Sequence, residues 1–373
     1  MYLTNGVLAA MISKNKILIA MQISMLAWSG YTLAADRVYV ANEGADSVNV
    51  LDAASLMTVD KVHVGKMPHN VQVSPDNKTV WVTNLGVNGT HSSGSEHMDM
   101  SKDAHSEKMD MGKDSHADKK EHGEVWIINA ENDTVISKLP VGAHPAHVIV
   151  TPDGKMAYIS NSADNTISVI DAEHLKNLTT INVGKFPHGL RVSPDGKEVY
   201  IANMKGGTVS VVETASNKEV AQIPLGKMPA QVGFSPDGKL VFVSLSGEDA
   251  VAVIDTATRK VVKKINVGTV PIQLFGTPDG KSMLVTNQGS KSKPGNTINM
   301  IDIASLTVAK TITTGDGAHG VVVDKNGKYA YVTNSFANSV SMIDINERKV
   351  VNTLPVDNNP NGISWGSVEV TPK

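Results

Sequence analysis

The chain has 373 residues, of which 41% are hydrophobic and 19% charged, and its formal net charge at pH 7 is −3. This size and balance describe a globular protein with one large domain or two smaller ones, and the slight acidity argues against a broad nucleic-acid-binding surface. Because there is no cysteine, disulfides, thiolate metal sites, cysteine nucleophiles and covalent c-type haem are excluded. A content of 31 glycines with only 4% aromatic residues favours short strands and tight turns.

The first 34 residues have the features of an export signal. Two lysines precede a mostly apolar run over residues 17–33, and the small residues Thr32 and Ala34 mark a cleavage site that would start the mature chain at Ala35. An uncleaved membrane anchor is the alternative, but the run contains several polar residues and is short for a span. We therefore expect a periplasmic or secreted protein with no membrane span after removal of the signal.

A 42-residue repeat occupies nearly all of the remaining chain. A four-residue strand motif recurs at Tyr39–Asn42, Trp81–Asn84, Tyr158–Asn161, Tyr200–Asn203, Phe242–Leu245, Leu284–Asn287 and Tyr331–Asn334. A second anchor closes the next strand at Asp52, Asn129, Asp171, Glu213, Asp255, Asp302 and Asp344. The spacing is 42 residues except where insertions of 35 and 5 residues lengthen it to 77 and 47. Seven units are therefore present between residues 35 and 373.

Each unit alternates apolar and polar residues, which is the pattern of half-buried strands. Turns of the type Pro-Asp-Gly-Lys precede the motif strand, beginning at Pro152, Pro194, Pro236 and Pro278. Proline fixes φ and glycine accepts positive φ, so these tetrapeptides suit tight turns. Four strands per unit, repeated seven times, predict an all-β, seven-bladed β-propeller with four antiparallel strands per blade.

The motif resembles that of the YVTN-type β-propeller family, whose tetrapeptide stands intact at Tyr331–Asn334. The resemblance covers about nine tenths of the chain and implies the propeller fold, but it carries little about function because propellers host many activities. The first unit lacks its opening strand, while an apolar segment, Ile363–Val370, follows the seventh. We expect this C-terminal segment to pair into the first blade and close the ring.

Both insertions fall between the second and third strands of a blade, on the face that also carries the links from one blade to the next. Those links place five histidines where the innermost strands begin, at His69, His144, His147, His188 and His319. One interpretation is architectural, with each histidine bonded to a neighbouring loop. The other is a metal or cofactor site on the propeller axis, a location that resembles the copper-cluster site of nitrous oxide reductase.

The larger insertion, within residues 85–123, has a composition of its own. It holds a duplicated pattern, Met98–His105 and Met109–His116, among acids, lysines and serines. Such a segment cannot form a core, so we expect a disordered loop in the second blade. Thioethers favour Cu(I) and imidazoles accept Cu(II), Zn(II) or Ni(II), and the loop resembles Met/His-rich segments of periplasmic copper-resistance proteins. Its candidate ligands are His91, His97, Met98, Met100, His105, Met109, Met111, His116 and His122.

These observations predict an exported, monomeric propeller that binds metal, with copper as the first candidate and zinc or nickel as alternatives, and that sequesters, buffers or delivers it. A solvated insertion without any ligand is the simplest competing interpretation. Two other functions stay open: a non-enzymatic scaffold for an exported protein partner, and an enzyme or cofactor carrier that uses the channel histidines. No catalytic constellation can be argued from the repeat positions, so an enzyme is not the first expectation.

Overall fold

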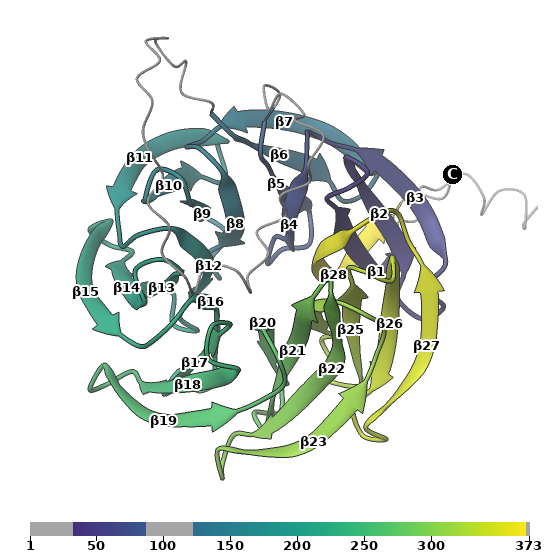
Figure 1. Ribbon diagram of the computed structural model, residues 1–373. Coiled ribbons are helices and arrows are strands. Elements are labelled where there is room, and N and C mark those ends of the chain that lie inside the picture. Colours follow the sequence, from purple (N-terminus) through teal and green to yellow (C-terminus); the bar gives the residue numbers. More distant parts are fainter. Residues whose placement is uncertain (1–32, 87–121, 371–373) are drawn as a thin grey trace, which may run out of the picture.

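The structure of the protein is a computed structural model that describes residues 33–86 and 122–370. Over these ranges the chain forms 28 strands and no helix. The strands make seven four-stranded sheets arranged around a central axis (Figure 1). All neighbouring strands within a sheet are antiparallel. The predicted seven-bladed propeller is therefore confirmed.

The strands of each blade are given from the axis outward. The first blade contains β28 (Pro360–Val370), β1 (Leu33–Asn42), β2 (Ser47–Asp52) and β3 (Thr58–His63). The second contains β4 (Pro68–Val73), β5 (Thr79–Asn84), β6 (Glu124–Asn129) and β7 (Thr134–Pro140). The third contains β8 (Pro145–Val150), β9 (Met156–Asn161), β10 (Thr166–Asp171) and β11 (Lys176–Asn182).

The remaining blades repeat this order. The fourth contains β12 (Pro187–Val192), β13 (Glu198–Asn203), β14 (Thr208–Glu213) and β15 (Lys218–Pro224). The fifth contains β16 (Pro229–Phe234), β17 (Leu240–Leu245), β18 (Ala250–Asp255) and β19 (Lys260–Asn266). The sixth contains β20 (Pro271–Gly276), β21 (Ser282–Ser290), β22 (Lys293–Asp302) and β23 (Thr307–Thr313). The seventh contains β24 (Ala318–Val323), β25 (Tyr329–Asn334), β26 (Ser339–Asp344) and β27 (Lys349–Pro355).

The ring is closed by the C-terminal strand, as the sequence predicts. β28 pairs antiparallel with β1, with Val38 opposite Trp365 and Ala35 opposite Val368. The ladder extends back to Leu33, two residues ahead of the expected start of the mature chain. Residues 1–32 of the expected signal lie outside the described residues. The part of the chain that the structure describes contains no helix long and apolar enough to cross a membrane.

The first residue of each strand motif packs in the core between blades. Tyr39, Trp81, Tyr158, Tyr200, Phe242, Leu284 and Tyr331 are all buried. Two of the tyrosines also reach an acceptor, since the Tyr331 hydroxyl donates to the Ala53 carbonyl at 2.9 Å and that of Tyr158 to the Asn217 side chain at 2.8 Å. A large apolar side chain at this position fills the wedge-shaped space between two twisted sheets, which explains why six units place an aromatic ring there and the seventh places Leu284.

In five of the seven motifs the third residue is a serine or threonine whose hydroxyl group connects neighbouring blades, whereas Ala41 and Ala202 stand there in the other two. Ser160 accepts a hydrogen bond from the His147 amide at 3.0 Å and donates to the His188 carbonyl at 2.6 Å. Thr83 and Thr333 donate in the same way to the carbonyls of Ala146 and Asn361. Each hydroxyl thus joins the inner strands of two blades, so the motif fixes the spacing of the residues at the start of those strands.

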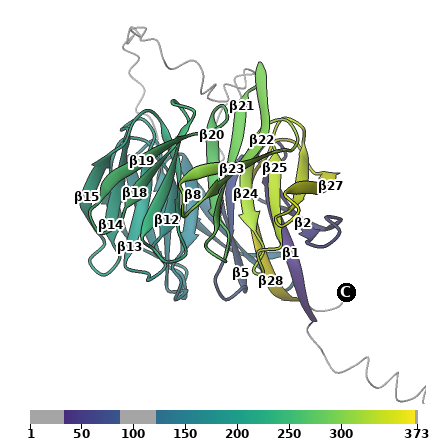
Figure 2. The ribbon, with the colours of Figure 1, turned by 90° about the horizontal axis from the view of Figure 1, so that it is seen from below.

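Both insertions lie between a second and a third strand, as expected. The smaller one lengthens the β21–β22 hairpin, with Ser290 opposite Lys293 at its tip (Figure 2). The larger one joins β5 to β6, and its described ends contact links between blades: the Leu85 amide donates to the Lys66 carbonyl at 2.9 Å and the Gly123 amide to the Gly142 carbonyl at 3.0 Å. Both insertions therefore emerge on the face where the inner strands begin.

Candidate functional site

The inner strands begin with a bend that directs side chains toward the axis. The residue before the first position of the strand has positive φ in every blade, for example 52° at Met67, 56° at Phe186 and 50° at Val270. A β-bulge follows at once, as the register shift between Pro187 and Leu190 shows. Bulges re-aim side chains, so the residues just after the bend project into the mouth of the channel.

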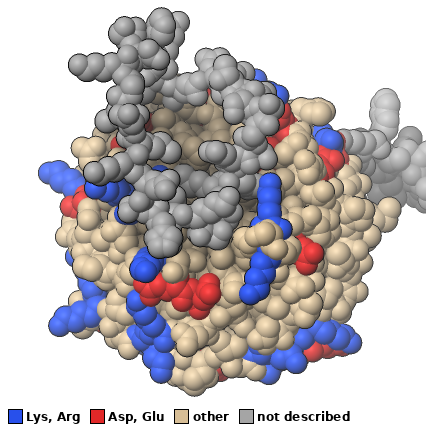
Figure 3. Space-filling model, viewed as in Figure 1, with Lys and Arg blue, Asp and Glu red and all other residues tan. Residues whose placement is uncertain are grey.

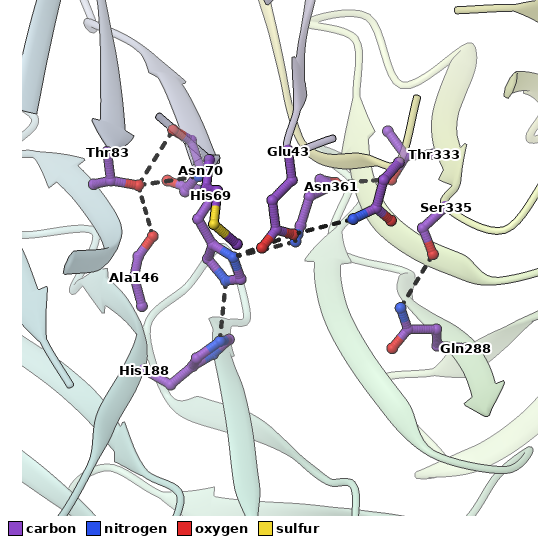
Figure 4. Close-up of polar contacts among 12 residues, drawn as sticks. Glu43, His69, Asn70, Thr83, Ala146, His188, Gln288, Thr333, Ser335 and Asn361 are labelled. Atoms are coloured by element: carbon purple, nitrogen blue, oxygen red, sulfur yellow. Dashed lines mark hydrogen bonds and ion pairs between the residues drawn. The ribbon is translucent and has the colours of Figure 1, made fainter. Parts of the chain in front are cut away.

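Three histidines from three successive blades meet at this mouth. One ring nitrogen from each of His69 on β4, His147 on β8 and His188 on β12 lies within 4.8 Å of the others. The ring centroids are 5.6, 5.2 and 4.8 Å apart for the pairs 69–147, 69–188 and 147–188. His69 Nε2 and His188 Nε2 are separated by only 3.2 Å (Figure 4). We call these three residues the histidine cluster.

The other ring nitrogen, Nδ1, is held by a surrounding polar group in each case. His188 Nδ1 donates to the Ala230 carbonyl at 2.9 Å, which links the fourth and fifth blades. His147 Nδ1 faces the Gln231 amide at 3.3 Å. His69 Nδ1 faces the Asn361 amide at 3.2 Å and lies 3.9 Å from a carboxylate oxygen of Glu43. The contacts of Nδ1 therefore agree with the architectural interpretation, in which each histidine is bonded to a neighbouring loop. The Nε2 atoms of His69 and His188 face each other instead.

Burial keeps two of the three histidines uncharged. His147 and His188 have relative exposures of 1% and 8%. Burial, reinforced by the neighbouring His69, lowers the pKa of His188 to about 3. Burial, together with His188 and His69, also holds the pKa of His147 well below its usual range. Neutral imidazole is the form that binds metals, and among the described residues His147 Nε2 has no hydrogen-bond partner although it is buried.

A family model described as YNCE-like beta-propeller matches residues 117–369, which is more than half of the chain. The chain belongs to the YNCE-like β-propeller family. The YVTN motif that the sequence contains remains a resemblance to a second family of the same fold. No curated protein sequence matches this YNCE-like propeller.

Solved structures resemble the YNCE-like propeller in fold. Hydrazine synthase of Kuenenia stuttgartiensis is 23% identical, with a TM-score of 0.64 over 81% of this chain and 91% of that one. The periplasmic gluconolactonase PpgL of Pseudomonas aeruginosa is 16% identical, with a TM-score of 0.68 over 90% and 100%. The dihydro-heme d1 dehydrogenase NirN is 16% identical, with a TM-score of 0.61 over 90% and 76%. These three proteins are named for different activities, so the similarities establish the propeller fold alone.

The other two predicted mouth histidines lie outside the cluster of this YNCE-like propeller. His319 on β24 is buried, and its ring centroid is 6.4 Å from that of His69. His144 is exposed at the rim, where its ring packs against Phe186 at 5.8 Å. The difference arises because His144 is itself the positive-φ residue at the bend, whereas the other four histidines follow the bend. In the third blade, three positions therefore separate the rim residue His144 from the cluster residue His147.

Most of the candidate ligands in the inserted segment lie outside the described residues: His91, His97, Met98, Met100, His105, Met109, Met111 and His116. His122 is described and is exposed at the end of the segment, next to β6. Both ends of the segment lie on the face that carries the histidine cluster, as the contacts of Leu85 and Gly123 show. Where the described residues are visible in Figure 3, basic and acidic side chains are interspersed around the rim.

Three polar residues around the cluster were missed in the sequence. Gln231 lies on β16, outside both repeated motifs, so the repeat pattern did not point to it. Arg191 on β12 donates to the Leu190 carbonyl at 3.0 Å, and burial lowers its pKa to about 10, so it stays a cation. Glu43 could have been found from the repeat, because it is the one charged residue at the position that follows the strand motif. The six other units have neutral residues there: Leu85, Ser162, Met204, Ser246, Gln288 and Ser335.

Proposed function

We propose that this protein is an exported metal-binding propeller that takes up a transition-metal ion at the histidine cluster, with copper as the first candidate. Its role is to sequester, buffer or deliver that ion. The observation that carries the proposal is the convergence of one ring nitrogen each from His69, His147 and His188 within 4.8 Å.

The spacing of the ring nitrogens suits metal coordination. Imidazole nitrogens bind first-row metals at about 2.0–2.1 Å, so two ligands on one ion lie roughly 3.3 Å apart. The Nε2 atoms of His69 and His188 are 3.2 Å apart. His147 Nε2, buried and without a partner among the described residues, gives the third donor. A ligand would relieve the cost of that unsatisfied polar atom.

The choice of copper rests on chemistry from two parts of the chain. Imidazole alone accepts copper, zinc or nickel. The inserted segment adds four methionines to its histidines, and thioethers select Cu(I) rather than zinc or nickel. Since both ends of the segment lie on the face of the cluster, we propose that it collects ions and that the cluster holds one more firmly. We propose that the ions bound by the segment are held more weakly and exchange faster than the ion at the cluster.

Titration of the full chain with Cu(I) against a chromogenic competing chelator tests the proposal. We expect one tight site that survives deletion of residues 91–121, together with several weaker ions that the deletion removes. In the deletion variant, the double substitution His147→Gln and His188→Gln should abolish the tight site. His63→Gln with His174→Gln is the control for histidine number. Equal Cu(I) affinity in the deletion variant with and without the cluster histidines would overturn the proposal.

A further inference from the structure

We propose that Glu43, acting with Asn361, is the positioning residue that turns His69 into a metal ligand and supplies the negative charge that balances the ion. This inference rests on the proposed function, because it concerns the same cluster. It identifies a carboxylate group outside the cluster as a determinant of binding, and it makes the site depend on the blade where the two ends of the chain meet.

The backbone around Glu43 is fixed against the end of the chain. Glu43 follows directly after β1, and its amide donates to the Asn359 carbonyl at 3.0 Å. The next amide, of Gly44, donates to the Asn358 carbonyl at 3.1 Å. A Cβ at Gly44 would lie 2.6 Å from the Asn358 amide nitrogen and 3.2 Å from the Asn358 backbone oxygen, so a larger residue would force Asn358 to shift. The loop therefore holds Glu43 in one place beside β28.

The Glu43 side chain is directed toward His69 (Figure 4). Its Oε2 accepts a hydrogen bond from Asn361 Nδ2 at 2.7 Å, and the same amide nitrogen lies 3.2 Å from His69 Nδ1. Oε2 itself lies 3.9 Å from His69 Nδ1, and the Glu43 side chain is 10% exposed. Glu43, Asn361 and His69 thus form a connected chain that ends at the cluster.

Blade architecture does not require this carboxylate. In the equivalent position of other units, a serine hydroxyl bonds to the link between blades, as Ser162 does with the Pro187 carbonyl at 2.6 Å and Ser335 with the Gly317 carbonyl at 3.0 Å. These contacts close the blade boundary without a charge. Glu43 extends past that boundary toward His69 on the next blade. Its charge therefore serves the surroundings of His69 and not the packing of the blades.

The proton positions explain what Glu43 would do. His188 Nδ1 faces a carbonyl oxygen, which can only accept, so the proton of neutral His188 is on Nδ1 and its Nε2 has a free lone pair. His69 Nε2 must then carry the proton that lies between the two Nε2 atoms. In this state His69 Nδ1 accepts from the Asn361 amide. His188 is ready to bind a metal, whereas His69 presents an N–H.

Metal binding therefore requires His69 to change tautomer. The Nε2 proton leaves and Nδ1 takes up one proton, so the ring stays neutral and the proton count is unchanged. The new Nδ1–H needs an acceptor, and Glu43 Oε2 would serve once the 3.9 Å gap closes by about 1 Å to hydrogen-bond length. A carboxylate that accepts from a ligating histidine fixes its tautomer and raises its basicity.

The charge of Glu43 also matters because imidazoles bind metals in their neutral form, and two of the three histidines are buried. Three neutral imidazoles offer no charge to offset a cation, and Arg191 adds an unfavourable one, which contributes to the low pKa of His147. One carboxylate balances one unit of positive charge, which matches Cu(I). Losing such a partner typically costs about 10–100-fold in metal affinity. We expect that range for Glu43→Gln, which keeps the side-chain size and removes the charge.

The experiment combines Cu(I) affinity with ¹⁵N NMR of the histidine rings in the full chain. In the wild-type protein we expect His69 to carry its proton on Nε2 before addition of Cu(I) and on Nδ1 afterwards. Glu43→Gln should weaken the cluster site about 10–100-fold, and Glu43→Asp should recover part of that loss. Glu248→Gln is the matched control, since Glu248 lies in the equivalent β17–β18 link, paired with Lys264 at 2.6 Å.

The outcomes separate this inference from the proposed function. If Cu(I) leaves the wild-type cluster resonances unchanged, the cluster does not bind the metal and both proposals fail. If Cu(I) binds there but Glu43→Gln has the affinity of Glu248→Gln, the function stands and the role of Glu43 is wrong. The tautomer of His69 in the wild-type protein tests the inference even if Glu43→Gln does not fold. If His69 keeps its proton on Nε2 after Cu(I) has bound, the inference is wrong.

Discussion

His69 and His188 are 119 positions apart in the chain, yet their Nε2 atoms lie 3.2 Å from each other across the channel mouth. The third blade lies between the two blades that carry them, so the contact spans the start of the channel. His147 from that middle blade completes the group. The two Nε2 atoms are close because the inner strands of all blades surround a narrow channel. The first residues of these strands therefore lie near one another although they belong to separate sheets.

The first prediction concerns Ser160, whose hydroxyl joins the backbones of His147 and His188. Ser160→Ala leaves a buried amide and a buried carbonyl without this partner, so the free energy of unfolding should fall by about 1–3 kcal/mol. Urea denaturation measures the change. Ser305→Ala removes an exposed hydroxyl bonded to Asp302 at 2.7 Å and should have little effect. Equal stability in the two variants would contradict the role of the motif hydroxyl.

The second prediction is a loss of stability in mild acid in the metal-free protein. The pKa of His188 is about 3 in the folded chain and about 6.5 in an unfolded one. The unfolded state therefore binds the proton first, and stability falls as pH decreases from about 6.5 toward 3, by up to about 1.4 kcal/mol per pH unit for this group. His147, whose pKa is also lowered, acts in the same direction.

Carboxylates cannot account for that window. The pKa values of Asp153, Asp195 and Asp237 are lowered, chiefly by hydrogen bonds from a neighbouring hydroxyl, so their stabilisation is lost only at lower pH, below about 4. Chemical denaturation between pH 7 and 4.5 should show a smaller slope for His188→Gln than for the wild type. His174→Gln, which removes an exposed histidine, should keep the wild-type slope. Parallel curves for all three proteins would rule out the assignment.

The third prediction addresses closure of the ring. Val368 on β28 is fully buried opposite Ala35 on β1, in the core between the first and second blades. Val368→Asp places an unpaired carboxylate in that core and should lower the free energy of unfolding by about 3 kcal/mol or more. Glu369→Gln changes an exposed residue on the same strand and should leave the midpoint of thermal unfolding nearly unchanged. A stable Val368→Asp variant would show that closure contributes little.

The fourth prediction is that a bound metal stabilises the fold. An ion that binds only the folded state raises the free energy of unfolding by about 2.7 kcal/mol when its free concentration is 100 times the dissociation constant. Cu(I) held at that level should therefore raise the melting temperature of the wild-type protein. The shift should persist without residues 91–121 and disappear when His147 and His188 are both glutamine. A shift that depends on the deleted segment instead would place the stabilising ion outside the cluster.

The blades can be predicted from the linear pattern of residues. Its 42-residue period and the turns before the motif strand predict the sheets, because six of the seven blades are built from strands that are consecutive along the chain. The extra strand at the C-terminus predicts how the remaining blade is completed. The sequence also predicted that histidines stand where the inner strands begin. These features depend on hydrophobic alternation and turn chemistry, which a linear pattern records directly.

Which of those histidines lie close together is seen in the tertiary structure alone. The bend and bulge at the start of each inner strand send His147 toward the axis and leave His144 exposed on the rim, although the two are three positions apart. The ring then places Glu43 and Asn361, from the blade that joins both ends of the chain, beside His69. Such contacts depend on the number of blades in the ring and on the backbone geometry at individual bulges. Neither the period nor the composition of the repeat specifies these contacts.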